Sequence, residues 1–536
     1  MNSRYILAAF VAVSLPLAAQ ETYENANLVT PDLNGTARYV GMGGAMEALG
    51  ADISTIGTNP AGIGLFRRSS ANVSFGVVSQ EGYNSFGDGN KTNMSFDQAG
   101  FVYSTRTGRS SFLNFAFNYS KSRNFNQILS AAGNSNGASQ NAVSYNKGAA
   151  GLDLYIKNNE ILCDNYQYSQ IDYLYYNTIL YNNKVDPENP YGFFDASKYM
   201  MDRSNTGYIS EFDFNISGNL NDRVYLGLTV GIKDVNYRSY SEYSELFIDP
   251  ASGNFLNSIG IGGVLLQDER EISGTGFDVK AGVIFRPVED SPFRVGLSVA
   301  TPTWYDLTTS NYTTLLIDDA DANPDIYAGN GGLDMSNSYD FKLFTPWKFG
   351  VSLGHTVGNY LALGASYEYA DYGSLDTRVN TDYDYYYDDY NSESDRDMNR
   401  HAKKTLQGVS TLKLGAEYKP DKNLAMRLGF NYVSPMYNKN GVKDGTIGSY
   451  GVTYQSTTDY TNWEDTYRVT AGFGYRMDKL NIDLAYQYSQ TNGTFRPFYD
   501  ACDNYYDYSA HNNNAADAVK VNNKRHQVLL TLGYTF

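Results

Sequence analysis

Segments in which bulky apolar residues alternate with small or polar ones recur along the chain. In the last of them, Val528, Leu530, Leu532, Tyr534 and Phe536 share one face. Such period-2 alternation predicts β-strands with two different faces. It marks about fourteen strands, an even number, at 72–79, 97–105, 111–120, 207–218, 223–237, 272–286, 292–304, 340–354, 359–371, 406–419, 423–433, 466–477, 479–489 and 525–536.

The connections between these segments alternate between short and long. The short ones are 106–110, 219–222, 287–291, 355–358, 420–422 and 478. A soluble sandwich also has two-faced strands, because it buries one face against a second sheet, but nothing in that fold requires alternating connection lengths. Transmembrane barrels combine short periplasmic turns with long outer loops. The pattern therefore predicts an all-β, transmembrane antiparallel β-barrel with both termini on the periplasmic side.

The composition agrees with a barrel that faces lipid on one side and water on the other. The chain has 49 Tyr, 50 Gly and 27 Phe, yet its mean hydropathy is -0.44. Its net charge of -17 argues against a nucleic-acid partner, whose phosphates need a basic surface. Acidic residues gather in predicted loops such as 381–390, where solvation is the simpler interpretation and calcium binding by Asp382, Asp384, Asp388 and Asp389 the alternative.

The first residues have the features of an export signal. Residues 1–4 carry a positive charge, 5–19 form an apolar run too short to span a bilayer, and small residues close it, which predicts cleavage near Ala19 or Gln20. The expected organisation is a signal peptide at 1–19, a compact segment at 20–70 and the barrel at 71–536. In an oxidising compartment Cys163 and Cys502 can pair, but their spacing does not decide whether they do.

The segment before the first strand is rich in Gly and lacks alternation. Residues 41–51 can form a short helix, and Asn59-Pro60 is a turn or helix-start signal. Gly41, Gly43 and Gly44, followed by Asn59-Pro60-Ala61-Gly62, resemble the N-terminal hatch of the FadL/TodX family of outer-membrane transporters, including its Asn-Pro-Ala motif. Segments 346–350, 426–435 and 467–488 resemble further parts of that family.

This resemblance implies a barrel plugged by a hatch in the outer membrane of a Gram-negative cell, among outer-membrane lipid and lipopolysaccharide. It implies passive uptake of hydrophobic small molecules such as long-chain fatty acids. Capture by outer loops, transfer to a lumenal site and lateral exit beside a kinked third strand would follow, with the kink expected near 114–120. No cofactor is implied.

Candidate ligand-binding residues come from the alternation and from loop composition. The inward-facing cations include Arg427 and Lys348, which fall in family-like segments and can hold a carboxylate head group. Pairing with inward-facing acids is the default for any one of them. The apolar stretches 151–156, 173–181 and 255–266 form either an external capture groove or loops that pack on one another above the barrel mouth.

Two other functions compete with uptake. A barrel of this type can be an interaction subunit, such as a cargo shuttle in type IX secretion, with its long Tyr- and Asp-rich extracellular loops as the surface for a protein partner. An outer-membrane hydrolase is the third possibility. The four histidines, at 355, 401, 511 and 526, have no Ser or Cys partner in a recognisable motif, so the sequence does not predict an enzyme.

Overall fold

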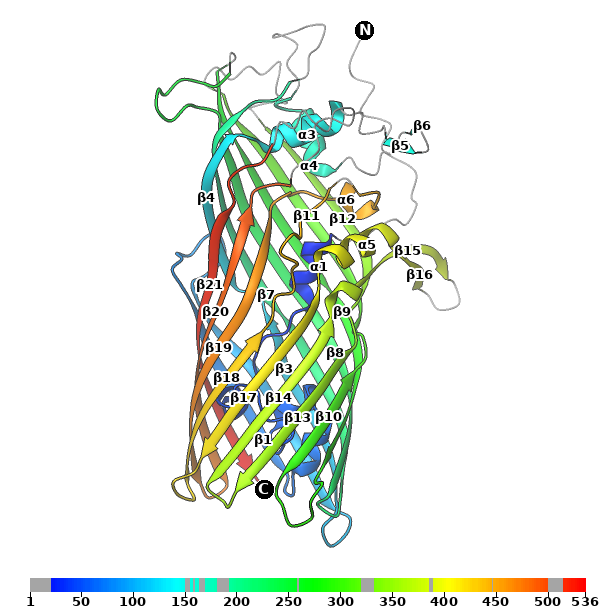
Figure 1. Cartoon of the computed structure of the whole chain (residues 1–536), viewed down its shortest axis with the longest axis vertical. Helices are drawn as coiled ribbons and strands as arrows, with labels where there is room; N and C mark the ends of the chain where they lie inside the picture. Colours follow the sequence, from blue (N-terminus) through cyan, green and yellow to red (C-terminus); the bar gives the residue numbers. More distant parts are fainter. Residues whose placement is uncertain are drawn as a thin grey trace.

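A single antiparallel sheet curls round and closes on itself as a 14-strand barrel (Figure 1). This computed structural model describes residues 21–149, 155–157, 160–162, 169–180, 192–257, 260–319, 332–384, 389–445, 447–499 and 514–536. The barrel closes where β1 (Ser70–Glu81) pairs with β21 (Val519–Thr535). Within the described residues, no helix has both the length and the apolar character needed to cross a bilayer.

Around the barrel, some wall strands are continuous and others consist of two consecutive pieces. The continuous ones are β2 (Thr92–Arg106), β7 (Ala196–Leu220), β8 (Val224–Leu246), β9 (Ile261–Phe285), β17 (Gly408–Tyr418), β18 (Leu424–Val433), β19 (Tyr460–Met477) and β20 (Leu480–Arg496). The divided ones are β3 (Phe112–Asn124) with β4 (Gln127–Gly137), β10 (Arg294–Ala300) with β11 (Trp304–Asp319), β13 (Lys348–Val357) with β12 (Gly332–Phe344), and β14 (Leu361–Asp371) with β15 (Asp376–Asp384).

The wall is apolar outside and polar inside, the reverse of a soluble protein. In β18, Met426 and Leu428 are 48% and 68% exposed, whereas Arg427 between them is 6% exposed. Phe349, Val351 and other outward side chains continue this apolar face round the barrel. An outward apolar band on a closed sheet is the surface of a barrel that lies in lipid. The predicted fold class is confirmed.

The two ends of the barrel differ. One end, called the turn end here, has short connections between the strands, and the C-terminus lies at this end (Figure 1). At the other, the loop end, the strands continue further than predicted: β7 and β9 each have 25 residues. The loop end also carries α3 (Gln140–Ala149), the hairpin β5 (Tyr155–Lys157) and β6 (Glu160–Leu162), α4 (Gln170–Tyr176), β16 (Asp389–Ser394), α5 (Arg396–Thr405) and α6 (Tyr450–Thr453).

The predicted single strands 292–304 and 340–354 are interrupted, at 301–303 and 345–347. Pro302 and Pro346 lie in these breaks, and a proline cannot donate to the ladder. The breaks bond to each other, since the Thr303 main-chain N–H donates to Thr345 Oγ1 at 2.8 Å and the Thr345 N–H donates to the Thr303 carbonyl at 3.1 Å. Alternation alone did not reveal this, because both pieces keep the same two-faced pattern.

Residues 21–69, called the plug segment here, lie inside the barrel. They contain α1 (Thr22–Val29), α2 (Ala37–Gly41) and the 3₁₀ turns η2 (Ile53–Gly57) and η3 (Pro60–Leu65). The prediction of a helix at 41–51 was wrong: α2 ends at Gly41 and turns follow. Gly43, Gly44 and Gly50 have φ angles of 63°, 81° and 61°, which a right-handed helix does not allow.

Candidate functional site

The Asn-Pro-Ala-Gly motif forms a tight turn pressed against the wall. Asn59 starts η3, and its side chain accepts a hydrogen bond from the Ala61 N–H at 3.2 Å, as the predicted helix-start signal requires. Asn59 is completely buried. The Pro60 carbonyl accepts a hydrogen bond from Ser217 Oγ of β7 at 2.9 Å. The motif is therefore an attachment point between the plug segment and the wall.

Wall glycines make room for this turn. A Cβ on Gly282 would lie 2.0 Å from Asn59 Oδ1, and one on Gly227 would lie 2.3 Å from the Pro60 carbonyl carbon. The two glycines are directly paired between β8 and β9. Only a residue without a side chain lets the plug main chain approach this closely.

A longer row of paired glycines, called the glycine row, lies beneath the turn at 42–48. The row consists of one glycine on each of four neighbouring strands, and each glycine is paired with the next. In the order β13, β14, β17 and β18 they are Gly354, Gly364, Gly415 and Gly429. A Cβ on Gly364 would lie 1.9 Å from the Ala45 carbonyl oxygen, and one on Gly429 would lie 2.1 Å from the Gly43 nitrogen. The sequence carries a signal for this row that alternation alone does not bring out, since each glycine follows an outward leucine.

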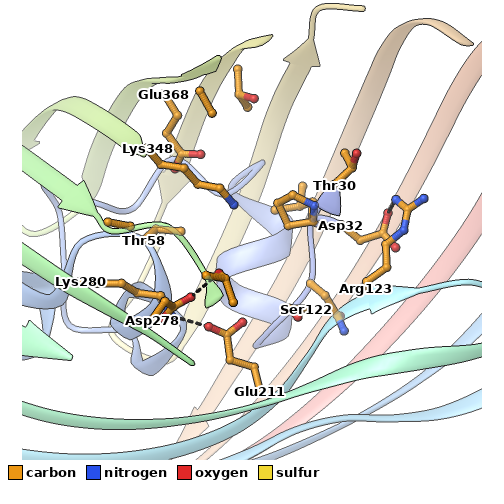
Figure 2. A pocket seen from close by; sticks show the side chains of 18 of the residues that line it. Thr30, Asp32, Thr58, Ser122, Arg123, Glu211, Asp278, Lys280, Lys348 and Glu368 are labelled. Atoms are coloured by element: carbon orange, nitrogen blue, oxygen red, sulfur yellow. Dashed lines mark hydrogen bonds and ion pairs between the residues drawn. The ribbon is translucent and has the colours of Figure 1, made fainter. Parts of the chain in front are cut away.

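A cavity of about 210 Å³ lies between α1 and the rest of the plug segment (Figure 2). Its apolar surface includes Leu28 and Val29 of α1 and Ile209, Val409 and Val433 of the wall. Leu28 and Val29 also belong to a cluster of nineteen buried apolar residues, which includes Phe125, Phe341 and Met436 and packs around α1. The cavity therefore lies beneath an apolar cover.

Charged side chains line the rest of the cavity, and most are paired. Lys233 Nζ lies 3.0 Å from Asp278 Oδ2, and Lys280 Nζ lies 2.9 Å from Asp213 Oδ1 and also contacts Glu211. Lys413 bridges Glu47 at 2.8 Å and Glu368 at 2.5 Å. These pairs agree with the default interpretation of inward-facing charges, because a nearby opposite charge offsets part of the cost of burying each one.

The two cations singled out from the sequence lie in different surroundings. Arg427 bonds Glu417 at 2.7 Å and Asp483 at 2.6 Å, and it lines a pocket nearer the turn end rather than this cavity. Lys348 lines the cavity and has no carboxylate oxygen within 4.0 Å among the described residues. Figure 2 shows its ammonium group directed into the cavity. Lys348 is therefore the better placed of the two to meet an anionic group.

Beside the cavity, the pairing between β2 and β3 stops before the strands end, and this unpaired stretch of the wall is called the seam here. β2 and β3 are paired from Arg106↔Phe112 to Gln98↔Ser120, and beyond Ser120 that pairing ends. Over 114–120, near which a kink was expected, β3 is still paired on both sides. Immediately after Ser120, the register of β3 against β7 shifts between Lys121 and Arg123.

Plug residues take the place of the missing strand partner along this seam. The Lys121 carbonyl accepts a hydrogen bond from Asn34 Nδ2 at 3.1 Å, and the Ser122 carbonyl accepts one from the Asp32 N–H at 2.8 Å. The Asn124 N–H donates to Asp32 Oδ2 at 3.0 Å. Ser120, Lys121, Ser122 and Arg123 also line the cavity. Side chains and turns of the plug, rather than a neighbouring strand, thus close the wall here.

The side chains of Asp32 and Gln80 make further contacts at the seam. The Asp32 carboxylate lies near Arg123, Arg468 and Arg525, at 3.5, 3.9 and 3.6 Å. Further towards the loop end, the Gln80 side chain accepts a hydrogen bond from the Ile128 N–H at 2.7 Å and donates one to the Ile128 carbonyl at 2.8 Å. A side-chain amide of β1 therefore acts as a strand partner for the edge of β4.

The loop end is filled by an apolar layer. Ile171, Leu174 and Tyr175 of α4 are buried with Leu266 of β9 and with Phe498. Described residues of the predicted stretches 173–181 and 255–266 therefore pack on one another, although Phe255 and Leu256 are 43% and 44% exposed. Residues 151–154, both cysteines and the predicted signal peptide lie outside the described residues, as do the side chains of the calcium candidates.

Comparison with known proteins gives matches only among solved structures. No sequence-family profile and no curated protein matches the chain. The toluene transporter TbuX of Ralstonia pickettii is 14% identical with a TM-score of 0.47, over 94% of this chain and 99% of that one. A Pseudomonas aeruginosa FadL homologue is 15% identical with a TM-score of 0.47, over 98% and 100%. The Pseudomonas putida toluene transporter TodX is 12% identical with a TM-score of 0.44, over 95% and 99%.

Proposed function

We propose that this protein is an outer-membrane channel for passive uptake of hydrophobic molecules, with long-chain fatty-acid-like amphiphiles as the favoured class. The observation that carries the proposal is the continuity of the cavity with the seam between β2 and β3. An apolar surface, the Lys348 ammonium group with no carboxylate within 4.0 Å among the described residues, and an interrupted wall occur together there. A barrel that served only as a scaffold needs none of these three features.

In this proposal the turn end faces the periplasm and the loops face outward. A solute is captured at the loop end, passes α1 and enters the cavity, where Lys348 holds an anionic head group. Movement of Asp32 and Asn34 away from β3 then opens the seam to lipid. Release of an acyl chain into the bilayer gains roughly 0.8 kcal/mol per methylene, so no energy source is needed.

The Asn59–Gly62 turn and the glycines at 41, 43 and 44 are the fixed base of the hatch in this proposal. The main-chain contacts with Gly227, Gly282 and the glycine row support that role, because these contacts leave little space for the plug to slide. The moving part is then limited to the residues at the seam.

Mass spectrometry of small molecules bound to the purified barrel tests the proposal. Protein extracted in mild detergent should carry an acyl-chain amphiphile, and the cavity-filling variant Ala300→Trp should lose it. Ala300→Ser is the matched control, since it changes the same cavity residue without filling the space. Recovery of a stoichiometric protein partner with no amphiphile would instead indicate the interaction role.

A further inference from the structure

Three arginines, called the seam arginines here, surround one carboxylate of the plug segment. Arg123 of β3, Arg468 of β19 and Arg525 of β21 lie 3.5, 3.9 and 3.6 Å from the Asp32 carboxylate. In the described part of the chain, no other carboxylate oxygen lies within 4.0 Å of any of the three. The seam arginines therefore carry two more positive charges than their ion-pair partner neutralises.

The pairing with Asp32 is also loose. All three distances exceed the roughly 2.7–2.9 Å that is typical of a charge-assisted hydrogen bond between arginine and a carboxylate. Arg468 Nη1 donates instead to Asn431 Oδ1 at 2.8 Å. Arg123 Nε is a buried donor without an acceptor among the described residues. The seam arginines therefore keep N–H donors for a carboxylate that can approach more closely than Asp32 does.

Two lysines of the same cavity are in the opposite situation. Lys233 and Lys280 are shared by three carboxylates, those of Glu211, Asp213 and Asp278, so the carboxylates outnumber the cations there. The excess negative charge repels an incoming anion. An anionic head group in the cavity is therefore attracted towards the seam and not towards these lysines.

Asp32 also closes the wall. Its N–H donates to the Ser122 carbonyl at 2.8 Å, and its Oδ2 accepts a hydrogen bond from the Asn124 N–H at 3.0 Å. Asp32, Arg123 and Arg468 line the cavity, and Figure 2 shows Asp32 beside Arg123. The carboxylate that holds the edge of β3 is thus the one that occupies the seam arginines, and it lies at the surface of the cavity.

We propose that the seam arginines are a carboxylate-binding site, that Asp32 occupies it while the wall is closed, and that a ligand carboxylate takes its place. This inference rests on the proposed function and names the trigger for the movement of Asp32. A ligand carboxylate is not tied to the plug main chain, so it can form the short hydrogen bonds that Asp32 does not form. One carboxylate replaces another, so the charge of the arginine site does not change.

The exchange makes opening of the seam selective for anionic amphiphiles. Once Asp32 has lost the attraction of the arginines, only its hydrogen bonds with Ser122 and Asn124 hold it against β3. A neutral hydrocarbon can fill the cavity, but it leaves Asp32 in place. Lys348 then acts in binding of the head group, and the seam arginines act in opening.

Hydrogen exchange at the Asn124 amide tests the inference in barrel purified from membranes, because that N–H donates to Asp32. Palmitate and hexadecanol have the same chain length and differ in the head group. They are compared at equal occupancy, measured by mass spectrometry of the bound molecule. We expect palmitate to speed exchange at least about tenfold, the effect of losing one hydrogen bond to a charged group, and hexadecanol to leave it unchanged.

Asp32→Asn tests the same inference without ligand. The amide keeps an oxygen for the Asn124 N–H but has no charge to hold it at the arginines. Exchange should therefore be faster than in the wild type, and palmitate should add little. Asp483→Asn is the matched control, since Asp483 also pairs with a lumenal arginine and is 14% exposed against 16% for Asp32, but lines the pocket nearer the turn end. This control should respond to palmitate as the wild type does.

The outcomes separate this inference from the proposed function. If both molecules bind and speed exchange equally, or neither speeds it, the exchange of carboxylates is wrong and the uptake proposal stands. A palmitate response of wild-type size in Asp32→Asn would also overturn the inference. If neither molecule binds to the wild type, the proposed function fails, and the inference fails with it.

Discussion

Lys348 differs from three other lysines that line the cavity. Lys233, Lys280 and Lys413 each contact a carboxylate, whereas Lys348 has none within ion-pair distance among the described residues. A cation already paired gains little from a ligand carboxylate, because it must give up an existing partner. Lys348 is therefore the residue at which head-group selectivity should be found.

Replacing Lys348 by Met should weaken binding of a long-chain fatty acid by at least about tenfold, since a charge-assisted hydrogen bond contributes roughly 1.5–3 kcal/mol. Binding of a neutral hydrocarbon of similar length should not fall, and Lys348→Arg should retain most of the fatty-acid affinity. Titration with a fluorescent fatty acid measures the change. Lys520→Met, at an exposed site of β21, is the control for loss of one lysine. Equal loss for acid and hydrocarbon would mean that Lys348 acts by packing alone.

The sequence could predict which side chains face inward but not which of them meet. Alternation alone places Arg427, Lys348 and Glu417 on the lumenal face. The partners of these charges come from distant parts of the chain, such as Glu47 for Lys413, separated by 366 residues. Such pairs depend on barrel register and on the path of the plug, and periodicity carries information about neither.

At the scale of elements, the seam depends on contacts that replace a missing strand. Gln80 is 4% exposed, and its amide satisfies both main-chain groups of Ile128. Removing that amide leaves a buried N–H and carbonyl unpaired, each costing about 1–3 kcal/mol.

Gln80→Ala should therefore loosen the edge of β4 at the seam. Hydrogen exchange at the Ile128 amide should speed up by at least about tenfold, because each 1.4 kcal/mol changes the opening equilibrium tenfold. Gln490→Ala in β20, away from the seam, should leave Ile128 exchange unchanged. If exchange at Ile128 were the same in all three proteins, Gln80 would not be holding the edge.

The glycine row leads to a second prediction at this scale. Gly364→Ala places a methyl group against the Ala45 carbonyl, and such overpacking costs about 1–3 kcal/mol. The variant should unfold at lower temperature and expose the plug segment to protease. Gly218→Ala is the matched control, since a Cβ there meets nothing within 4 Å. Equal stability of the two variants would show that the plug is not held by the row.

Strand existence could be predicted from the sequence, whereas strand length and interruption could not. The outward apolar residues mark only the part of each strand that faces lipid, so β7, β8 and β9 continue beyond the predicted ends. The irregularity of β3 was expected near 114–120, and it lies just beyond, at 121–123. The position of the seam depends on where β2 stops pairing with β3 and on the contacts of Asp32 and Asn34 of the plug segment. The alternation of side chains within β3 contains no information about either.

At the scale of the whole molecule, three levels of the lumen are closed in different ways. Loops form an apolar layer at the loop end, α1 fills the middle, and the plug turns rest on wall glycines towards the turn end. Among the described residues, the wall is interrupted next to the cavity between β2 and β3. The proposed exit route is therefore lateral, through this interruption, and not through the anchored plug.

Cross-linking the seam tests lateral exit most directly. In a background with Cys163 and Cys502 replaced by Ser, Asn34→Cys with Lys121→Cys joins the plug to β3, and Ala37→Cys with Thr531→Cys joins the anchored α2 to β21. Uptake of a fluorescent long-chain fatty acid into cells is measured with each pair oxidised and then reduced. We expect the seam cross-link to stop uptake until it is reduced and the α2 cross-link to have no effect. Unchanged uptake with a fully formed seam cross-link would contradict lateral exit.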